Sequence, residues 1–233
     1  MSTPFFYEAF LPLSPTHFEL SAETSKHCIQ VLRMQVGETI ALTNGLGLRY
    51  DATIVSADKK QTVVSLSNKV FIEQAIKRSS IAISFVKNAA RMEWFLEKAT
   101  EIGVAEFYPL ISERTERAQF KAARWESILV SAMLQSQQVW KPQLHAPIEF
   151  GQMMQKEMEG LKMIAHCEEG TKQTINEMPL MNTQLMLIGP EGDFTSEEIS
   201  TALAHQFKPV SLGNTRLRTE TAAIAAAVLM QNR

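Results

Sequence analysis

Hydrophobic residues recur with two different periods along the chain. Up to about residue 72 they form short runs that alternate with polar residues, such as 39–42 and 62–66, and this period of two predicts half-buried strands. The segments 44–45 (Asn-Gly) and 58–60 separate such runs and have the composition of turns. Closely spaced short strands predict a small β-barrel. One short helix is expected before them, at about 23–32.

From about residue 73, short apolar runs alternate with stretches of helical spacing. Thr195 and Glu198 have the spacing of a capping box that opens a helix running to about Gln206. The predicted strands are 81–86, 107–111, 163–166, 185–188 and 209–212, and the other predicted helices are 92–102 (closed by Gly103), 125–132 and 219–230. This alternation predicts an α/β fold whose mostly parallel sheet is covered on both faces. Two domains are expected, a β-barrel over 1–72 and an α/β domain over 73–233.

Composition narrows the possible functions. The chain has 233 residues, 45% of them hydrophobic, and a formal net charge of -2, so RNA binding would require a local basic surface and not bulk charge. The two cysteines and five histidines are scattered, which predicts neither a disulfide framework nor a metal site. The N-terminal segment lacks the pattern of a signal peptide, and no apolar run reaches the ~20 residues of a membrane span. A cytoplasmic protein without a membrane partner is therefore expected.

Two of the late predicted strands end in glycine, at Gly189 and Gly213. Glycine allows positive φ and a close approach of the backbone to a ligand, and Pro190 stiffens the first of these turns. Ligands of parallel α/β sheets bind beyond the carboxyl ends of the strands. If the two strands are neighbours, their loops form one binding site.

The type of ligand follows from what the turn contains. No GxxxxGK[ST] sequence is present, which excludes a P-loop. The acidic residues Glu191 and Asp193 disfavour phosphate and tolerate a cationic or neutral ligand. S-adenosylmethionine, a sulfonium compound without phosphate, fits this description.

The two late motifs resemble a known family. LIGPEGDFTSEEI (187–199) followed by VSLGNTRLRTETAAIAA (210–226) is similar to the paired C-terminal motifs of the ribosomal RNA small subunit methyltransferase E family, and 87–117 and 27–47 resemble its first strand–helix–strand unit and its N-terminal barrel. The resemblance implies a SPOUT-class, trefoil-knotted domain preceded by a PUA-like barrel. It also implies a homodimer that methylates N3 of one uridine in the decoding region of 16S rRNA, with S-adenosylmethionine as cofactor and no metal.

Carried over position by position, the resemblance implies a cofactor site made of Leu187, Gly189, Pro190, Glu191, Gly192, Leu212, Gly213, Leu217, Arg218 and Thr219. One stretch departs from the family pattern. The family usually carries Glu-Gln-Ser-x-Arg before the central proline, whereas this chain has Leu134 and Gln138 at the positions of the acid and the arginine.

Methylation of uridine N3 requires removal of a weakly acidic proton and stabilisation of the developing anion. Arg218, in the loop beside the expected cofactor, is the candidate for stabilising that anion, and Glu220 or Glu191 is the candidate for taking the proton. A salt bridge from Arg218 to Glu220 that only orders the loop is the alternative. For Asp193 a turn-shaping role is favoured.

RNA contacts are expected from a set of cations, each of which could equally be a solvated surface charge: Lys26, Arg33, Lys87, Arg91 and Arg114. Two other functions stay open. One is a non-catalytic RNA-binding protein with a degenerate knotted domain, which S-adenosylmethionine affinity would exclude. The other is a SPOUT enzyme that acts on transfer RNA or on a ribose 2′-hydroxyl.

Overall fold

The computed structural model describes residues 3–13, 16–116 and 119–232. The chain divides into two compact units. The first unit comprises Met1–Gln74 and Met133–Lys141, and the second comprises Ala75–Ala132 and Pro142–Arg233. The first unit thus combines the N-terminal part of the chain with a segment, 133–141, that lies about 60 residues further along the sequence.

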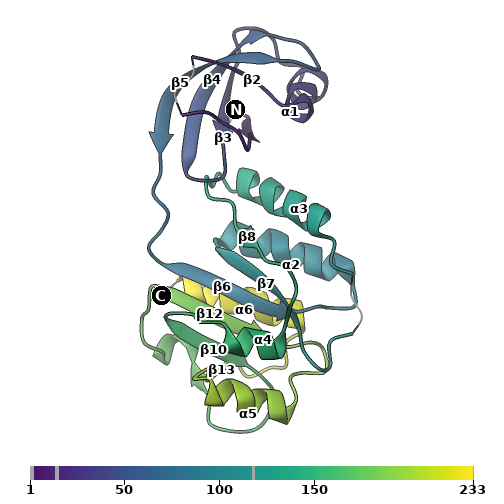
Figure 1. Ribbon diagram of the computed structural model, residues 1–233, viewed down its shortest axis with the longest axis vertical. Coiled ribbons are helices and arrows are strands. Elements are labelled where there is room, and N and C mark those ends of the chain that lie inside the picture. Colours follow the sequence, from purple (N-terminus) through teal and green to yellow (C-terminus); the bar gives the residue numbers. More distant parts are fainter. Residues whose placement is uncertain (1–2, 14–15, 117–118, 233) are drawn as a thin grey trace. The chain divides into compact units, whose positions relative to one another are not determined.

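The first unit is built on a curled five-stranded sheet with the strand order β1-β3-β4-β5-β2 (Figure 1). Its central strands β3, β4 and β5 pair antiparallel in sequence order. Side chains of β4 alternate between buried and less buried positions along most of its length, as the period of two predicts. The bounds are β1 (Phe5–Tyr7), β2 (His17–Glu19), β3 (Thr39–Thr43), β4 (Leu48–Ser56) and β5 (Val63–Phe71).

The predicted short helix is present, but with two geometries. An α-helix, α1 (Ala22–Lys26), continues directly into a π-helix, η1 (His27–Val31). Ser21 caps α1, since its hydroxyl oxygen accepts a hydrogen bond from the Thr24 amide at 3.3 Å. The position of the helix is confirmed, whereas the sequence pattern gave no sign of its π-helical second half.

The segment 139–141 is joined to the β3–β4 turn of the first unit. The Gly47 amide donates to the Val139 carbonyl and the Lys141 amide donates to the Gly45 carbonyl, both at 2.9 Å. The Trp140 indole N–H donates to the Ile72 carbonyl at 2.8 Å. A Cβ at Gly47, where φ is +87°, would lie 2.6 Å from the Trp140 ring. Glycine at 47 is therefore required by both conformation and space.

The second unit contains an eight-stranded sheet with the order β11-β13-β10-β12-β6-β7-β8, to which β9 adds on β7. All its strand pairs are parallel, so the predicted mostly parallel sheet is confirmed. The bounds are β6 (Arg78–Ser84), β7 (Glu106–Ile111), β8 (Gln143–Leu144), β9 (Ile148–Glu149), β10 (Leu161–Ala165), β11 (Gln173–Thr174), β12 (Thr183–Ile188) and β13 (Lys208–Ser211). The two-residue strands β8, β9 and β11 were not predicted.

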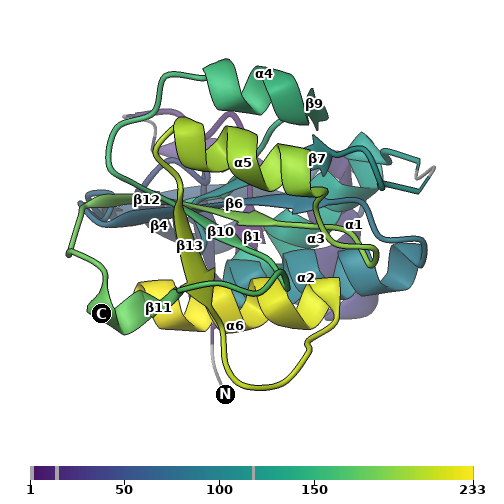
Figure 2. The ribbon, with the colours of Figure 1, turned by 90° about the horizontal axis from the view of Figure 1, so that it is seen from below.

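Helices cover both faces of this sheet, as predicted (Figure 2). One face carries α2 (Ala89–Ile102), α6 (Thr219–Gln231) and the part of α3 (Ala122–Gln135) that belongs to the second unit, and the other carries α4 (Phe150–Gln155) and α5 (Ser196–Ala204). In β12, Met186 and Ile188 point to the first face, and Leu185 and Leu187 to the second. Burial on both faces explains why the last four residues of this strand, 185–188, are all apolar.

The predicted helix boundaries rest on local signals that the structure confirms. Gly103 ends α2 in the left-handed conformation, with φ of +99°. The capping box of α5 is present, since the Glu198 amide donates to the Thr195 hydroxyl at 3.2 Å and the Thr195 amide donates to the Glu198 carboxylate at 2.9 Å. The helix itself ends at Ala204, two residues before the predicted end.

The strand order of the second unit agrees with a knotted topology. Strand β13 lies between β10 and β11, two strands that precede it in the chain and are joined by residues 166–172. A 3₁₀ helix, η2 (Ile175–Glu177), follows β11 and contacts α6, which follows β13. The late segment therefore runs through the loop formed by the earlier one, as expected for the SPOUT class.

Candidate active site

Three parallel strands of the second unit end side by side. Ala165 at the end of β10 is in register with Ile188 of β12 on one side and with Val210 of β13 on the other. The loops after these strands line one cavity of about 540 Å³. The two glycine-ended strands thus share a site, but they are not neighbours, because β10 lies between them. The loop after β10 adds a third side to the cavity, which the sequence did not indicate.

The turn after β12 is held by the side chain of Asp193. The Asp193 amide donates to the Pro190 carbonyl at 2.9 Å, and φ at Asp193 is +63°. One carboxylate oxygen accepts from the Phe194 amide at 2.8 Å and the other from the Cys167 amide at 2.6 Å. The favoured turn-shaping role of Asp193 is confirmed, and the same carboxylate ties this turn to the loop after β10.

The two strand-end glycines are needed for different reasons. A Cβ at Gly189 would lie 3.1 Å from the ring of Phe194, which is buried. Gly213 has open space around it but a φ of +137°, a conformation that L-residues with a side chain rarely adopt. The first glycine therefore allows close packing, and the second allows the turn itself.

Eight of the ten cofactor residues implied by the resemblance line this cavity. The exceptions are Leu187, whose side chain is buried in the core, and Gly192, which lies against the side chain of Arg114. The cavity has further lining residues that the sequence reasoning missed, namely Ala165, His166, Cys167, Lys172, Ile188, Val210, Ser211, Asn214, Thr215, Arg216 and Ala222. For His166 and Cys167, the sequence did offer a signal, namely the polar sequence His-Cys-Glu-Glu (166–169) directly after a buried strand.

Charges of both signs surround the cavity. Glu191 and Asp193 line it from the turn after β12, whereas Lys172, Arg216 and Arg218 line it from the other loops. A ligand that carries both a cationic and an anionic group can find a complement for each within this site.

Burial and the nearby charges shift the pKa values of the His166 and Cys167 side chains. Burial lowers the pKa of the His166 imidazole and the Lys172 charge lowers it further, with Asp193 acting in the opposite sense. Burial and the nearby Asp193 carboxylate raise the pKa of the Cys167 thiol. Both side chains are therefore neutral at pH 7.

Glu220 lies next to the cavity and does not line it. Its side chain is 9% exposed, and Oε1 pairs with Arg91 Nε at 3.5 Å. Its second oxygen, Oε2, is buried and has no hydrogen-bond partner among the described residues. The partner in the recorded ion pair of Glu220 is thus Arg91 on α2, and not Arg218 as the loop-ordering alternative supposed.

The predicted RNA-binding cations differ in their surroundings. Lys87 pairs with Glu116 at 3.2 Å, and Arg114 donates to the Gly192 carbonyl at 2.8 Å, so that it supports the turn after β12. In the first unit, Lys26 and Arg33 are exposed, at the end of α1 and after η1. Neither of these two forms an ion pair with the part of the chain that the structure describes.

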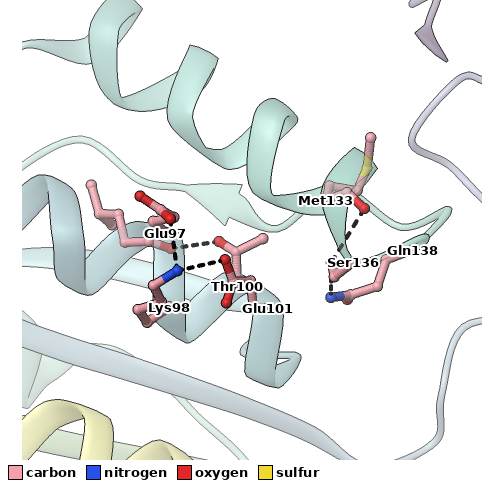
Figure 3. Close-up of polar contacts among 8 residues, drawn as sticks. Glu97, Lys98, Thr100, Glu101, Met133, Ser136 and Gln138 are labelled. Carbon is pink, nitrogen blue, oxygen red and sulfur yellow. Dashed lines mark hydrogen bonds and ion pairs between the residues drawn. The ribbon is translucent and has the colours of Figure 1, made fainter. Parts of the chain in front are cut away.

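Hydrogen bonds within the stretch that departs from the family pattern stabilise the end of α3. The Gln138 side-chain amide donates to the Ser136 hydroxyl at 2.8 Å, and this hydroxyl donates to the Met133 carbonyl at 3.3 Å (Figure 3). The Gln138 backbone amide also donates to the Met133 carbonyl, at 2.9 Å. The glutamine at the usual arginine position thus takes part in ordering the end of α3.

Three other findings concern the described residues as a whole. They hold no group of three or more His, Cys, Asp or Glu side chains that could bind a metal ion. Among their helices, none combines the length and apolar character needed to cross a bilayer. Both cysteines are free thiols.

Comparison with known proteins finds a family model for each of the two parts of the chain. The model of an RNA methyltransferase domain matches residues 73–231, and that of an RNA methyltransferase PUA domain matches residues 20–67. Ribosomal RNA small subunit methyltransferase E of Synechocystis is 31% identical over 210 residues, which cover 86% of this chain and 68% of the relative.

Two solved structures with bound S-adenosylmethionine are similar. A methyltransferase from Legionella pneumophila is 32% identical, with a TM-score of 0.90 and coverage of 100% of this chain and 98% of the other. The ribosomal RNA small subunit methyltransferase E of Neisseria gonorrhoeae is 27% identical, with a TM-score of 0.90 and coverage of 99% and 98%. Taken with the parallel sheet and the cavity at its strand ends, these matches show that the chain belongs to the ribosomal RNA small subunit methyltransferase E family.

Proposed function

We propose that this protein binds S-adenosylmethionine in the cavity at the ends of β10, β12 and β13 and methylates N3 of a uridine in small-subunit ribosomal RNA. The observation that carries the proposal is the convergence of three strand-end loops on one cavity, one of them with a glycine at a φ of +137° and another with a glycine packed against Phe194. Membership of the family and the S-adenosylmethionine bound to two relatives support the choice of ligand.

The residues around the cavity fit this cofactor. A volume of about 540 Å³ lies within the range of small-molecule sites, ~300–1,000 Å³. Glu191 and Asp193 suit the cationic sulfonium and ammonium groups, and Lys172 and Arg216 suit the carboxylate. Gly213 has open space where a Cβ would lie, so the backbone of its loop can approach the adenine closely.

Bound S-adenosylmethionine supplies an electrophilic methyl group whose bond to sulfur breaks as the new bond to nitrogen forms, leaving neutral S-adenosylhomocysteine. The uracil must give up its N3 proton, and negative charge then spreads over the two carbonyl oxygens. Arg218 is exposed at the cavity, from where its guanidinium can donate hydrogen bonds to one of these oxygens. Stabilisation of developing charge by a fixed donor is among the largest contributions to catalysis.

The N3 proton needs an acceptor, for which we propose Glu220. Its Oε2 is buried without a partner, an arrangement that calls for a reason, and Arg91 holds the other oxygen. Glu191 is the second candidate, because it is exposed and lines the cavity.

The two acids can be separated by single-turnover rates measured against pH. Replacing the acceptor by glutamine should lower the rate at neutral pH and restore it at alkaline pH, where the uracil loses its proton to solvent. Glu220→Gln is expected to show this recovery, and Glu191→Gln is expected to affect mainly cofactor affinity. Recovery in Glu191→Gln alone would transfer the role to Glu191.

RNA recognition is assigned to the barrel region 1–72, with Lys26 and Arg33 as phosphate contacts, and to cations near the α/β site. Of these, Lys87 is 77% exposed and fits a phosphate contact. Arg91 and Arg114 are proposed to act on RNA less directly, because Arg91 already pairs with Glu220 and Arg114 already donates to the Gly192 carbonyl.

A homodimer is part of the proposal by family resemblance, and sedimentation equilibrium would test it.

The decisive experiment supplies purified protein, labelled S-adenosylmethionine and small ribosomal subunits that lack N3-methyluridine, followed by mass spectrometry of the digested RNA. Label in N3-methyluridine at one position supports the proposal. Label in another nucleoside, in a ribose 2′-hydroxyl or only in transfer RNA refutes the stated specificity, and absence of cofactor binding refutes the enzyme.

Arg218→Ala should reduce the single-turnover rate at saturating S-adenosylmethionine by roughly 10- to 100-fold. The matched control is Arg124→Ala, an exposed arginine on α3 that pairs with Glu93 outside the cavity. Equal rates in Arg218→Ala and the wild type would remove Arg218 from the mechanism.

A further inference from the structure

His166 is the first residue after β10, the central one of the three strands that end at the cavity. It lines the cavity, and both its ring nitrogens are buried without a hydrogen-bond partner in the described chain. Its neighbour Cys167 is tied through its backbone amide to Asp193. The backbone next to His166 is thus tied to the turn after β12, and the imidazole lies in the cavity wall with both nitrogens covered and unpartnered, so that a small rotation of the ring would be needed to bring one of them to a ligand.

An unpartnered polar ring is a poor choice for structural packing alone. Buried polar groups are costly unless they are hydrogen-bonded, and an aromatic ring without nitrogens would fill a similar space without that cost. Residues that break such a rule tend to lie at functional sites. The position of His166 in the cavity therefore points to a partner that arrives with the ligand.

The chemistry of the ring selects the part of the ligand. A neutral imidazole has one donor and one acceptor, and burial favours the neutral form here. A carboxylate only accepts and an ammonium only donates, and Lys172, Glu191 and Asp193 are available to these two groups. A hydroxyl can both donate and accept, so it suits either ring nitrogen.

We propose that His166 hydrogen-bonds a ribose hydroxyl of the bound cofactor and so fixes the nucleoside half of S-adenosylmethionine against β10. This inference rests on the proposed function, because it requires the cofactor in this cavity. It adds a residue of the loop after β10 to a site that the sequence assigned only to the loops after β12 and β13.

The test compares the wild type with His166→Phe and His166→Gln by calorimetric titration with S-adenosylmethionine and with 5′-methylthioadenosine, which keeps adenine and ribose but lacks the amino-acid group. His166→Phe should bind both ligands about three- to tenfold more weakly, the effect of one lost hydrogen bond. His166→Gln, which retains a donor and an acceptor, should recover part of the affinity. The matched control is His205→Phe, the same change at the end of α5 and outside the cavity.

Stability without ligand provides a second readout. Because the ring nitrogens have no protein partner, His166→Phe should unfold at the same temperature as the wild type or higher, whereas a structural histidine would lower it. Unchanged affinity of His166→Phe for both ligands, or a loss confined to S-adenosylmethionine, would overturn the ribose contact. A wild type that binds neither ligand would instead refute the proposed function, so the two failures are distinguishable.

Discussion

The Asp193 carboxylate should be the main brace of the turn after β12, and replacing it tests how the cavity is held together. Asp193→Ala removes the acceptor of the Cys167 and Phe194 amides, at 2.6 and 2.8 Å. It also places alanine at a φ of +63°, where residues other than Gly, Asn and Asp are disfavoured by ~1–2 kcal/mol. Asp193→Asn is the matched variant, because asparagine tolerates this conformation and keeps one acceptor oxygen.

The expected magnitudes follow from these two contributions. Hydrogen bonds to a charged group contribute ~1.5–3 kcal/mol when well buried, and partial exposure of Asp193 reduces this to about 1 kcal/mol. Asp193→Ala should therefore lower the free energy of unfolding by ~2–3 kcal/mol, and Asp193→Asn by ~1 kcal/mol.

Urea unfolding measures these differences directly, and titration with S-adenosylmethionine shows their effect on the site. Loss of the tie to Cys167 should weaken cofactor binding in both variants, more in the alanine variant. If both variants unfold within about 0.5 kcal/mol of the wild type, the carboxylate does not brace the turn. If alanine and asparagine are equally destabilising, backbone conformation contributes nothing at this position.

Two further predictions concern positions outside the cavity. Gly47→Ala would place a Cβ 2.6 Å from the Ile72 carbonyl oxygen at a φ of +87°, and should lower the free energy of unfolding of the first unit by more than ~3 kcal/mol. The control Gly37→Ala, which has a similar φ but open space, should lower it by only ~1 kcal/mol. Similar values for the two variants would show that crowding at 47 is not the cause. Burial opposes ionisation of Glu106, but the hydrogen bonds with Tyr108 and His145 and the nearby Arg78 charge lower its pKa below the usual value. The resulting stability is present above the unfolded-state pKa and lost as pH falls through the folded-state pKa. The free energy of unfolding, measured against pH, should therefore fall less on acidification in Glu106→Gln than in the wild type. Parallel pH dependences in the two proteins would refute this linkage.

Elements whose signals are local were predicted well from the sequence. The apolar run of β12 reflects burial on both faces, and the ends of α2 and the start of α5 follow from Gly103 and the Thr195–Glu198 capping box. The glycine-ended strands located the cavity for the same reason, because the requirement for glycine arises within a few residues of each turn.

Features that depend on distant partners were missed. Strands of two residues, such as β8 and β11, exist only because a neighbouring strand offers hydrogen bonds. The place of β10 between β12 and β13 is a property of strand order, and no local pattern reports it. For this reason the contribution of His166 to the cavity was not inferred, although a polar sequence follows its strand, and neither was the bond of Arg114 to the Gly192 carbonyl 78 residues away.

The placement of β13 between β10 and β11 has a consequence for the timing of synthesis. The strands β10 and β11 on either side of β13 leave the ribosome before it, so the side of the cavity formed by the loop after β13 is added only after 208–219 have passed through a loop that already exists. A nascent chain that has reached only β12 can have most of its hydrophobic core and still lack a complete pocket. Methyl-transfer capability should therefore appear late and abruptly, when threading is finished, and a slowly threading variant would accumulate as a compact but inactive protein.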